Sequence, residues 1–172
     1  MNLDSFFVGV TGHRSFIELA DPLFLNSLDS MLARLEGIHP GTKPTLLSGL
    51  ATGADTMVAM RALAKGWLLH AVLAKPLPHY YSDFDTDADR AQLDFLVSLS
   101  EKVLEVSTPD VGDPQCYVNV GEFIIKNVHQ LLAVWDGDLK NPKPGGTAWV
   151  VTHFLERHAL NKNNLHILRV RR

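Results

Sequence analysis

Four short runs are apolar at nearly every consecutive position, and they limit the fold more than any other feature. They lie at 6–10, 45–47, 68–74 and 131–135, and each is followed within two residues by Gly, Pro or Asp. A strand with one face in water alternates apolar and polar residues, whereas a strand buried on both faces does not. The runs therefore predict central strands of a parallel sheet that is covered by helices on both sides.

Stretches with helical features separate these runs. Asp21 and Pro22 form a start signal, because the aspartate side chain caps free amides and the first turn does not need the proline N–H. This helix is predicted to end at Glu36, before a glycine. A second predicted helix, 54–65, is followed by Gly66, and its apolar residues cover more than one face. We expect it to pack on the sheet and also to meet a partner subunit.

Further helices are predicted at 117–130 and 147–158, and weaker strands at 103–106 and 165–170. Strand and helix thus alternate along the chain, which is the pattern of the α/β class. The predicted architecture is a three-layer Rossmann-like domain with a mostly parallel sheet. Because 172 residues suit one hydrophobic core, residues 1–172 are expected to form a single domain.

Composition narrows the classes of function. Hydrophobic residues make up 46% and the formal net charge is −3, so a packed core is expected and nucleic acid is an unfavoured partner. Cys116 is the only cysteine, and no histidine pair has a metal-ligand spacing, so neither a disulfide nor a metal site is predicted. Without a basic leader or a long apolar run, the chain is expected to be cytoplasmic and away from membranes.

Small residues gather where three of the predicted strands end. The carboxyl ends of parallel strands meet at one edge of a sheet, where helix N-termini offer free N–H groups to anions. The predicted ligand-binding residues are Gly12, His13 and Arg14 after the first strand, Ser48, Gly49, Gly53 and Asp55 after the second, and Asp136, Gly145, Gly146 and Thr147 after the fourth. Pro144 and the residues to Thr147 open a helix, so they predict an anion cradle.

Each of these features also has a plainer interpretation. A single turn that contains glycine usually has no role in binding. Acidic residues such as Asp55 commonly interact with the first turn of their own helix instead of with a ligand. The irregular segments 75–86 and 107–115 are long enough to be functional or mobile. Within the first, Tyr80 and Tyr81 suggest either a lid over a ligand or an ordinary surface loop. The coincidence of three turns at strand ends favours the functional interpretation.

Three segments, taken together and in this order, resemble the SLOG superfamily, which includes Smf/DprA-type and LOG-type proteins. They are Val10-Thr-Gly-His-Arg14, Leu47-Ser-Gly-Leu-Ala-Thr-Gly-Ala-Asp55, and Leu132-Ala-Val-Trp-Asp-Gly137 followed by Gly-Gly-Thr147. The resemblance is greatest to the YpsA-like branch. It implies a Rossmann-like fold, frequent dimers, and a nucleotide-type ligand held by these loops. We expect a homodimer or a higher homo-oligomer, and no cofactor is predicted.

The residues after Thr147 differ from the LOG-type pattern. Those hydrolases have glutamates soon after a longer glycine turn, whereas this chain has Ala148, Trp149 and Val150. General acid–base catalysis contributes roughly 10²- to 10⁴-fold to a reaction rate. A phosphate site that lacks the catalytic glutamates can therefore still bind its ligand without catalysing hydrolysis. The leading hypothesis is therefore a nucleotide binder, such as a sensor. The alternatives are a nucleoside-monophosphate phosphoribohydrolase, with Glu122 or Asp136 as the substitute carboxylate, and a single-stranded DNA binder.

Overall fold

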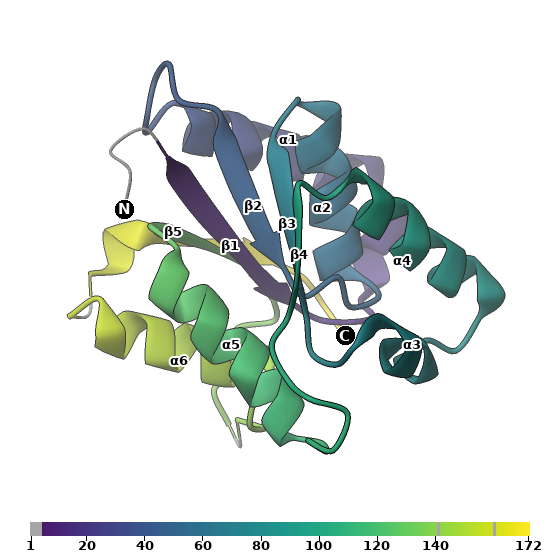
Figure 1. Ribbon diagram of the computed structural model, residues 1–172. Coiled ribbons are helices and arrows are strands. Elements are labelled where there is room, and N and C mark those ends of the chain that lie inside the picture. The colour runs from purple at the N-terminus through teal and green to yellow at the C-terminus, as the bar shows by residue number, and fades with distance from the viewer. Residues whose placement is uncertain (1–4, 141, 160) are drawn as a thin grey trace.

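A six-stranded sheet forms the centre of the protein in the computed structural model, which describes residues 5–140, 142–159 and 161–172 (Figure 1). Every pairing is parallel, and the order is β4-β3-β2-β1-β5-β6. The strands are β1 (Phe6–Gly12), β2 (Pro44–Ser48), β3 (Leu68–Leu73), β4 (Lys102–Glu105), β5 (Gln130–Trp135) and β6 (Leu165–Arg169). The predicted α/β class with a parallel sheet is confirmed.

Helices cover both faces of this sheet and give three layers (Figure 1). They are α1 (Pro22–Glu36), α2 (Ala54–Ala64), α3 (Leu77–Tyr80), α4 (Asp87–Leu99), α5 (Gln115–Asn127) and α6 (Thr147–Arg157). Residues of α1, α2 and α4 share one apolar cluster with the sheet, and residues of α5 and α6 share the other. Among the described helices, none has both the length and the apolar character that crossing a bilayer requires.

Strand β5 shows why the central runs lack alternation. Leu132 and Val134 lie in the cluster with α1 and α2, whereas Leu131, Ala133 and Trp135 lie in the cluster with α5 and α6. Both sets are at most 3% exposed, so neither face of the strand meets water. Burial on both sides is therefore the physical origin of the consecutive apolar residues.

Contacts within the chain explain why apolar residues cover more than one face of α2. This helix packs on the sheet and also contacts α1 and α4. Its Arg61 forms an ion pair with Asp29 of α1. Neighbouring helices thus cover much of the apolar surface that suggested a partner subunit, although Met60 stays exposed.

Helix α4 escaped the sequence interpretation, and the segment 75–86 is more ordered than expected. Thr86 caps α4, because its Oγ1 accepts a hydrogen bond from the Asp89 amide at 3.1 Å. Buried Leu93 and Leu96 hold the helix on the protein. Acidic residues dominate its first turn, so the short apolar stripe of the helix is not apparent from the sequence. The segment 75–86 contains α3 and a 3-10 turn rather than irregular chain alone.

Strand order reverses beside β1. The chain steps outward from β1 through β2 and β3 to β4, and then returns to place β5 on the other side of β1. The connections leave β1 and β5 in opposite directions, which opens a crevice at their carboxyl ends. This is the edge of the sheet at which the small-residue turns lie.

The turn after β1 lies directly against the start of α2. The Ala54 amide donates to the His13 carbonyl at 3.0 Å. Gly53 has φ +94°, and a Cβ there would overlap the Arg14 carbonyl group. A Cβ on Gly12 would overlap the Ala54 side chain in the same way. Glycine at both positions therefore lets the turn and the helix touch.

Gly53→Ala should destabilise the fold by more than backbone strain alone. Gly66 has a similar φ of +85°, but no atom lies within 4 Å of the position of its missing Cβ. Gly66→Ala is thus the matched control and should cost about 1–2 kcal/mol of unfolding free energy. Gly53→Ala should cost about 1–3 kcal/mol more, because the methyl group overlaps backbone atoms and because ψ of −118° lies outside the left-handed region. Urea unfolding of both variants measures the difference, and equal losses would contradict the close-contact interpretation.

Candidate functional site

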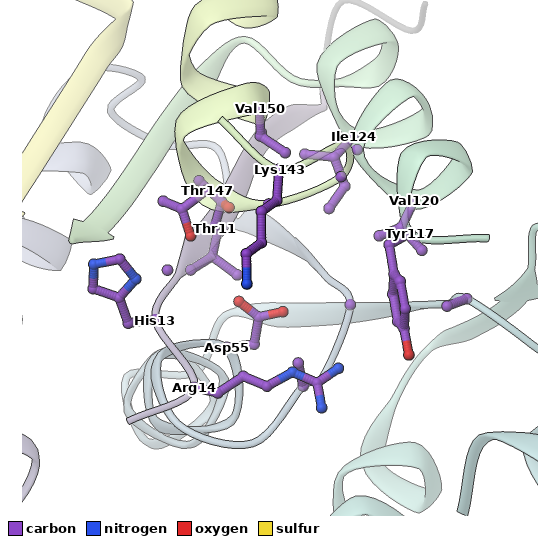
Figure 2. A pocket seen from close by; sticks show the side chains of 18 of the residues that line it. Thr11, His13, Arg14, Asp55, Tyr117, Val120, Ile124, Lys143, Thr147 and Val150 are labelled. Atoms are coloured by element: carbon purple, nitrogen blue, oxygen red, sulfur yellow. The ribbon is translucent and has the colours of Figure 1, made fainter. Parts of the chain in front are cut away.

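A cavity of about 630 Å³ opens at the reversal of the strand order (Figure 2). Its lining comes from the ends of β1 and β2, the first turn of α2, one side of α5 and the turn before α6. Most of the residues predicted from the sequence line it: Gly12, His13, Arg14, Gly49, Asp55, Gly145, Gly146 and Thr147. The structure thus brings the three separate turns together around one space.

The N-terminus of α6 forms one wall of the cavity. Gly146 is its N-cap, and the Val150 amide donates to the Gly146 carbonyl at 2.9 Å, which closes the first turn. The amides of a first helical turn have no carbonyl partner within the helix and carry partial positive charge. Thr147 adds a hydroxyl group on the same wall (Figure 2). This wall suits an anion.

Three cationic side chains line the cavity. Arg172 pairs with Asp136, whereas Lys143 and Arg14 reach the space from opposite sides. Lys143 precedes the glycine turn and extends into the space beside Thr147 (Figure 2). Within the described part of the chain, Lys143 forms no salt bridge. Arg14 is exposed, and its guanidinium group donates to the Asp83 carbonyl at 3.2 Å. Both charges are therefore accessible to a ligand.

Asp55 is the only acidic residue among the described residues that line the cavity. Its carboxyl group points into the space that Lys143 and Arg14 also enter (Figure 2). Burial raises the pKa of Asp55 from 3.8 to about 7, although a backbone hydrogen bond at Ala51 and the charge of Arg14 act in the opposite direction. The side chain is thus poised to change charge near neutral pH.

Three predicted residues support the cavity without lining it. The Ser48 hydroxyl accepts from the Leu50 amide at 3.1 Å and so supports Leu50 at its positive φ of 55°. Gly53 packs against the backbone of Arg14. A carboxylate oxygen of Asp136 lies 3.2 Å from buried His13 Nε2, behind the lining. The pKa of Asp136 is lowered, mainly by the hydrogen bond from the Asp138 amide and to a smaller extent by His13 and Arg172.

The sequence interpretation missed the wall that α5 supplies. Tyr117 and an apolar group line the cavity there: Val120, Gly121 and Ile124, joined by Val150 from α6. The sequence predicted a helix at 117–130 but did not show that one side of it faces a cavity. Lys143 also lines the cavity. Its position next to the glycine turn is the sequence feature that could have indicated this role.

Tyr80 is part of the cavity floor rather than of a lid. It is 2% exposed, and its hydroxyl donates to the Gly49 carbonyl at 2.8 Å. Tyr81 faces outward and bonds to Asp94. Glu122, one candidate substitute carboxylate, pairs with Lys126 on the exposed side of α5 and does not line the cavity. Asp136 does not line it either, so Asp55 is the carboxylate to consider.

Histidine, cysteine and acidic residues do not cluster in threes that could hold a metal ion anywhere in the described ranges. Mg²⁺ and Ca²⁺ require several oxygen ligands, whereas the described lining of the cavity offers one carboxylate, which lies beside cationic side chains. Its donors therefore suit an anionic ligand.

The sequence matches no protein-family model and no curated protein. Among solved structures, DNA processing protein A (DprA) from Streptococcus pneumoniae aligns with a TM-score of 0.61 and 17% identity, over 95% of this chain and 58% of that chain. DprA from Helicobacter pylori, in a structure concerned with its single-stranded DNA binding mode, aligns with a TM-score of 0.62 and 14% identity, over 95% of this chain and 65% of that chain.

The Moco carrier protein from Chlamydomonas rheinhardtii aligns with a TM-score of 0.49 and 15% identity, over 96% of this chain and 90% of that chain. The two DprA alignments show a shared fold, which confirms the Rossmann-like fold that the SLOG resemblance implies. This chain spans less than two thirds of either DprA chain. The YpsA-like assignment stays a prediction.

Asp55→Asn should change how stability depends on pH. A carboxyl group whose pKa rises on folding holds its proton more tightly in the folded state, so it lowers stability as pH increases from about 4 to about 7. Because the group is partly open to the cavity, we expect a loss of about 2 kcal/mol rather than the full effect of the shift. Unfolding free energies at pH 4.5 and 8 should show this loss in wild type but not in Asp55→Asn. Parallel pH profiles would contradict it.

Proposed function

We propose that the protein binds a nucleotide or nucleotide-derived phosphate ligand in the cavity, with the phosphoryl group at the N-terminus of α6. The observation that carries this proposal is the convergence of that helix start with Lys143 and Arg14 on one cavity. Free amides and cations together provide charge-assisted donors for a phosphate. A sensor or carrier role needs only this binding.

The cavity also has room and surfaces for the rest of such a ligand. Its volume of about 630 Å³ lies within the range of about 300–1,000 Å³ that is typical of small-molecule sites. The apolar wall of Val120, Ile124 and Val150 stands beside the phosphate wall. A ligand with one anionic end and one less polar end therefore matches the lining. The homodimer and the cytoplasmic location remain predictions from the sequence.

Adenine nucleotides and NAD should raise the melting temperature of the protein. A ligand at 100 times its Kd stabilises the folded state by about 2.7 kcal/mol, which is roughly 5–10 °C for a chain of this size. Lys143→Met should weaken binding by about tenfold or more, because it removes a charge-assisted contact. Lys126→Met, on the exposed side of α5, is the matched control and should bind like wild type.

Several results of this screen would count against the proposal. Absence of stabilisation by all nucleotides and by inorganic phosphate would remove its basis. Equal losses in Lys143→Met and Lys126→Met would place the ligand elsewhere. Single-stranded oligonucleotides belong in the same screen, because one of the compared DprA structures concerns single-stranded DNA binding. Tighter, salt-dependent binding of oligonucleotides than of mononucleotides would favour that alternative.

A second candidate function, hydrolysis of the N-glycosidic bond of a nucleoside monophosphate, is favoured by Asp55. Its carboxyl group lies in the cavity and exchanges its proton near pH 7. In this reaction the bond from C1′ to the base nitrogen breaks and water supplies a hydroxyl group to C1′. The Asp55 proton goes to the leaving base, and the second proton of water restores the carboxyl group.

Asp55→Asn tests this chemistry. The amide cannot supply the proton, so release of free base should fall by about 10²- to 10⁴-fold while nucleotide affinity is retained. Wild-type activity should decline above pH 7, where Asp55 loses its proton. Chromatography of nucleoside monophosphates after incubation measures the released base. If the wild-type protein releases no free base from any nucleoside monophosphate in the panel, the hydrolase candidate fails.

A further inference from the structure

We propose that the ring of Tyr117 is a stacking platform for the aromatic base of the ligand, so that the cavity selects a nucleoside phosphate over a sugar phosphate. This inference rests on the proposed phosphate site and names the other half of the same ligand. Tyr117 lies in the first turn of α5 and lines the cavity.

Hydrogen bonds hold the Tyr117 ring in place from outside the cavity. Its hydroxyl donates to Asp83 Oδ2 at 2.6 Å, and Asp83 Oδ1 accepts from Lys75 Nζ at 2.8 Å. The Asp83 and Lys75 side chains are 8% and 16% exposed, so water competes little for these bonds. Burial and the bond to Asp83 raise the pKa of Tyr117 to about 12, which keeps the donating proton in place at neutral pH. A ring fixed in advance loses little entropy on stacking.

The ring faces the space that the other ligand-facing groups border. In Figure 2 it stands on the opposite side of that space from His13, with Arg14 and Asp55 between them. The Arg14 guanidinium carbon is 5.7 Å from the ring centroid, within the range of a cation–π contact. Bases stack on both aromatic rings and arginine planes. Arg14 is exposed, and among the described residues its guanidinium group has one hydrogen bond, to the Asp83 carbonyl, so little holds its side chain away from an incoming base.

The platform adjoins the phosphate wall. A Cβ on Gly145 would lie 2.7 Å from the Tyr117 backbone, so the glycine turn touches the start of α5. The base and the phosphate of one nucleotide are likewise separated only by a ribose. Val120 and Ile124 continue the wall from Tyr117 along α5 and give the edge of a base an apolar neighbour.

Calorimetric titration of the wild-type protein with AMP, ribose 5-phosphate and inorganic phosphate tests the inference. Stacking on an aromatic side chain contributes about 1–3 kcal/mol per base, so AMP should bind about 5- to 150-fold more tightly than ribose 5-phosphate. Tyr117→Leu should lose this advantage for AMP and keep the affinity for ribose 5-phosphate. Tyr117→Phe keeps the ring and should stay within about threefold of wild type for AMP.

Tyr81→Leu is the matched control, because Tyr81 also bonds to a carboxylate, that of Asp94, but does not line the cavity. It should bind all three ligands like wild type. If AMP and ribose 5-phosphate bind the wild-type protein equally, the platform is overturned and the phosphate site stands. If none of the three binds, both proposals fail. The wild-type comparison decides these outcomes even where Tyr117→Leu does not fold.

Discussion

The close contact between the turn after β1 and the first turn of α2 is the constraint on which the site depends. Gly12 and Gly53 contribute no side-chain atoms to this contact, and the His13 carbonyl accepts a hydrogen bond from the Ala54 amide across it. Because β1 lies between β2 and β5, this contact fixes the floor of the cavity to the centre of the sheet. Arg14 and Asp55 emerge on either side of it and therefore enter the same space from different elements.

The charges of the site depend on one another. A phosphate at the N-terminus of α6 would place negative charge near the Asp55 carboxyl group, which would raise its pKa further and keep it neutral. Lys143 and Arg14 act in the opposite direction, because their positive charge favours both the ligand and an ionised Asp55. Burial already brings the pKa of Asp55 to about 7, so binding of the proposed phosphate ligand would be coupled to the protonation of this one group.

The fold was predictable from the sequence because burial on both faces leaves a local pattern. The central strands β1, β2, β3 and β5 and four of the helices follow from consecutive apolar residues and caps. The edge strands β4 and β6 are partly exposed, so their sequence signal was weaker. Helix α4 did not follow, because only Leu93 and Leu96 mark its buried side among many charged residues. The site was predictable as a region, since strand ends converge by topology. The roles of its residues were not, because the orientation of a side chain such as Tyr117 depends on contacts between distant segments, here with Asp83.

The residues after Thr147 explain why binding is the better supported function. Trp149 stacks on His153, with ring centroids 4.0 Å apart. A Cβ added to Gly121 would lie 2.9 Å from the Trp149 ring, so α6 is seated tightly on α5. The residues that follow Thr147 therefore hold two helices together, and none of Ala148, Trp149 and Val150 carries a carboxylate. Asp55, the remaining carboxylate, approaches from α2, so any chemistry at this site would start from a different side of the ligand.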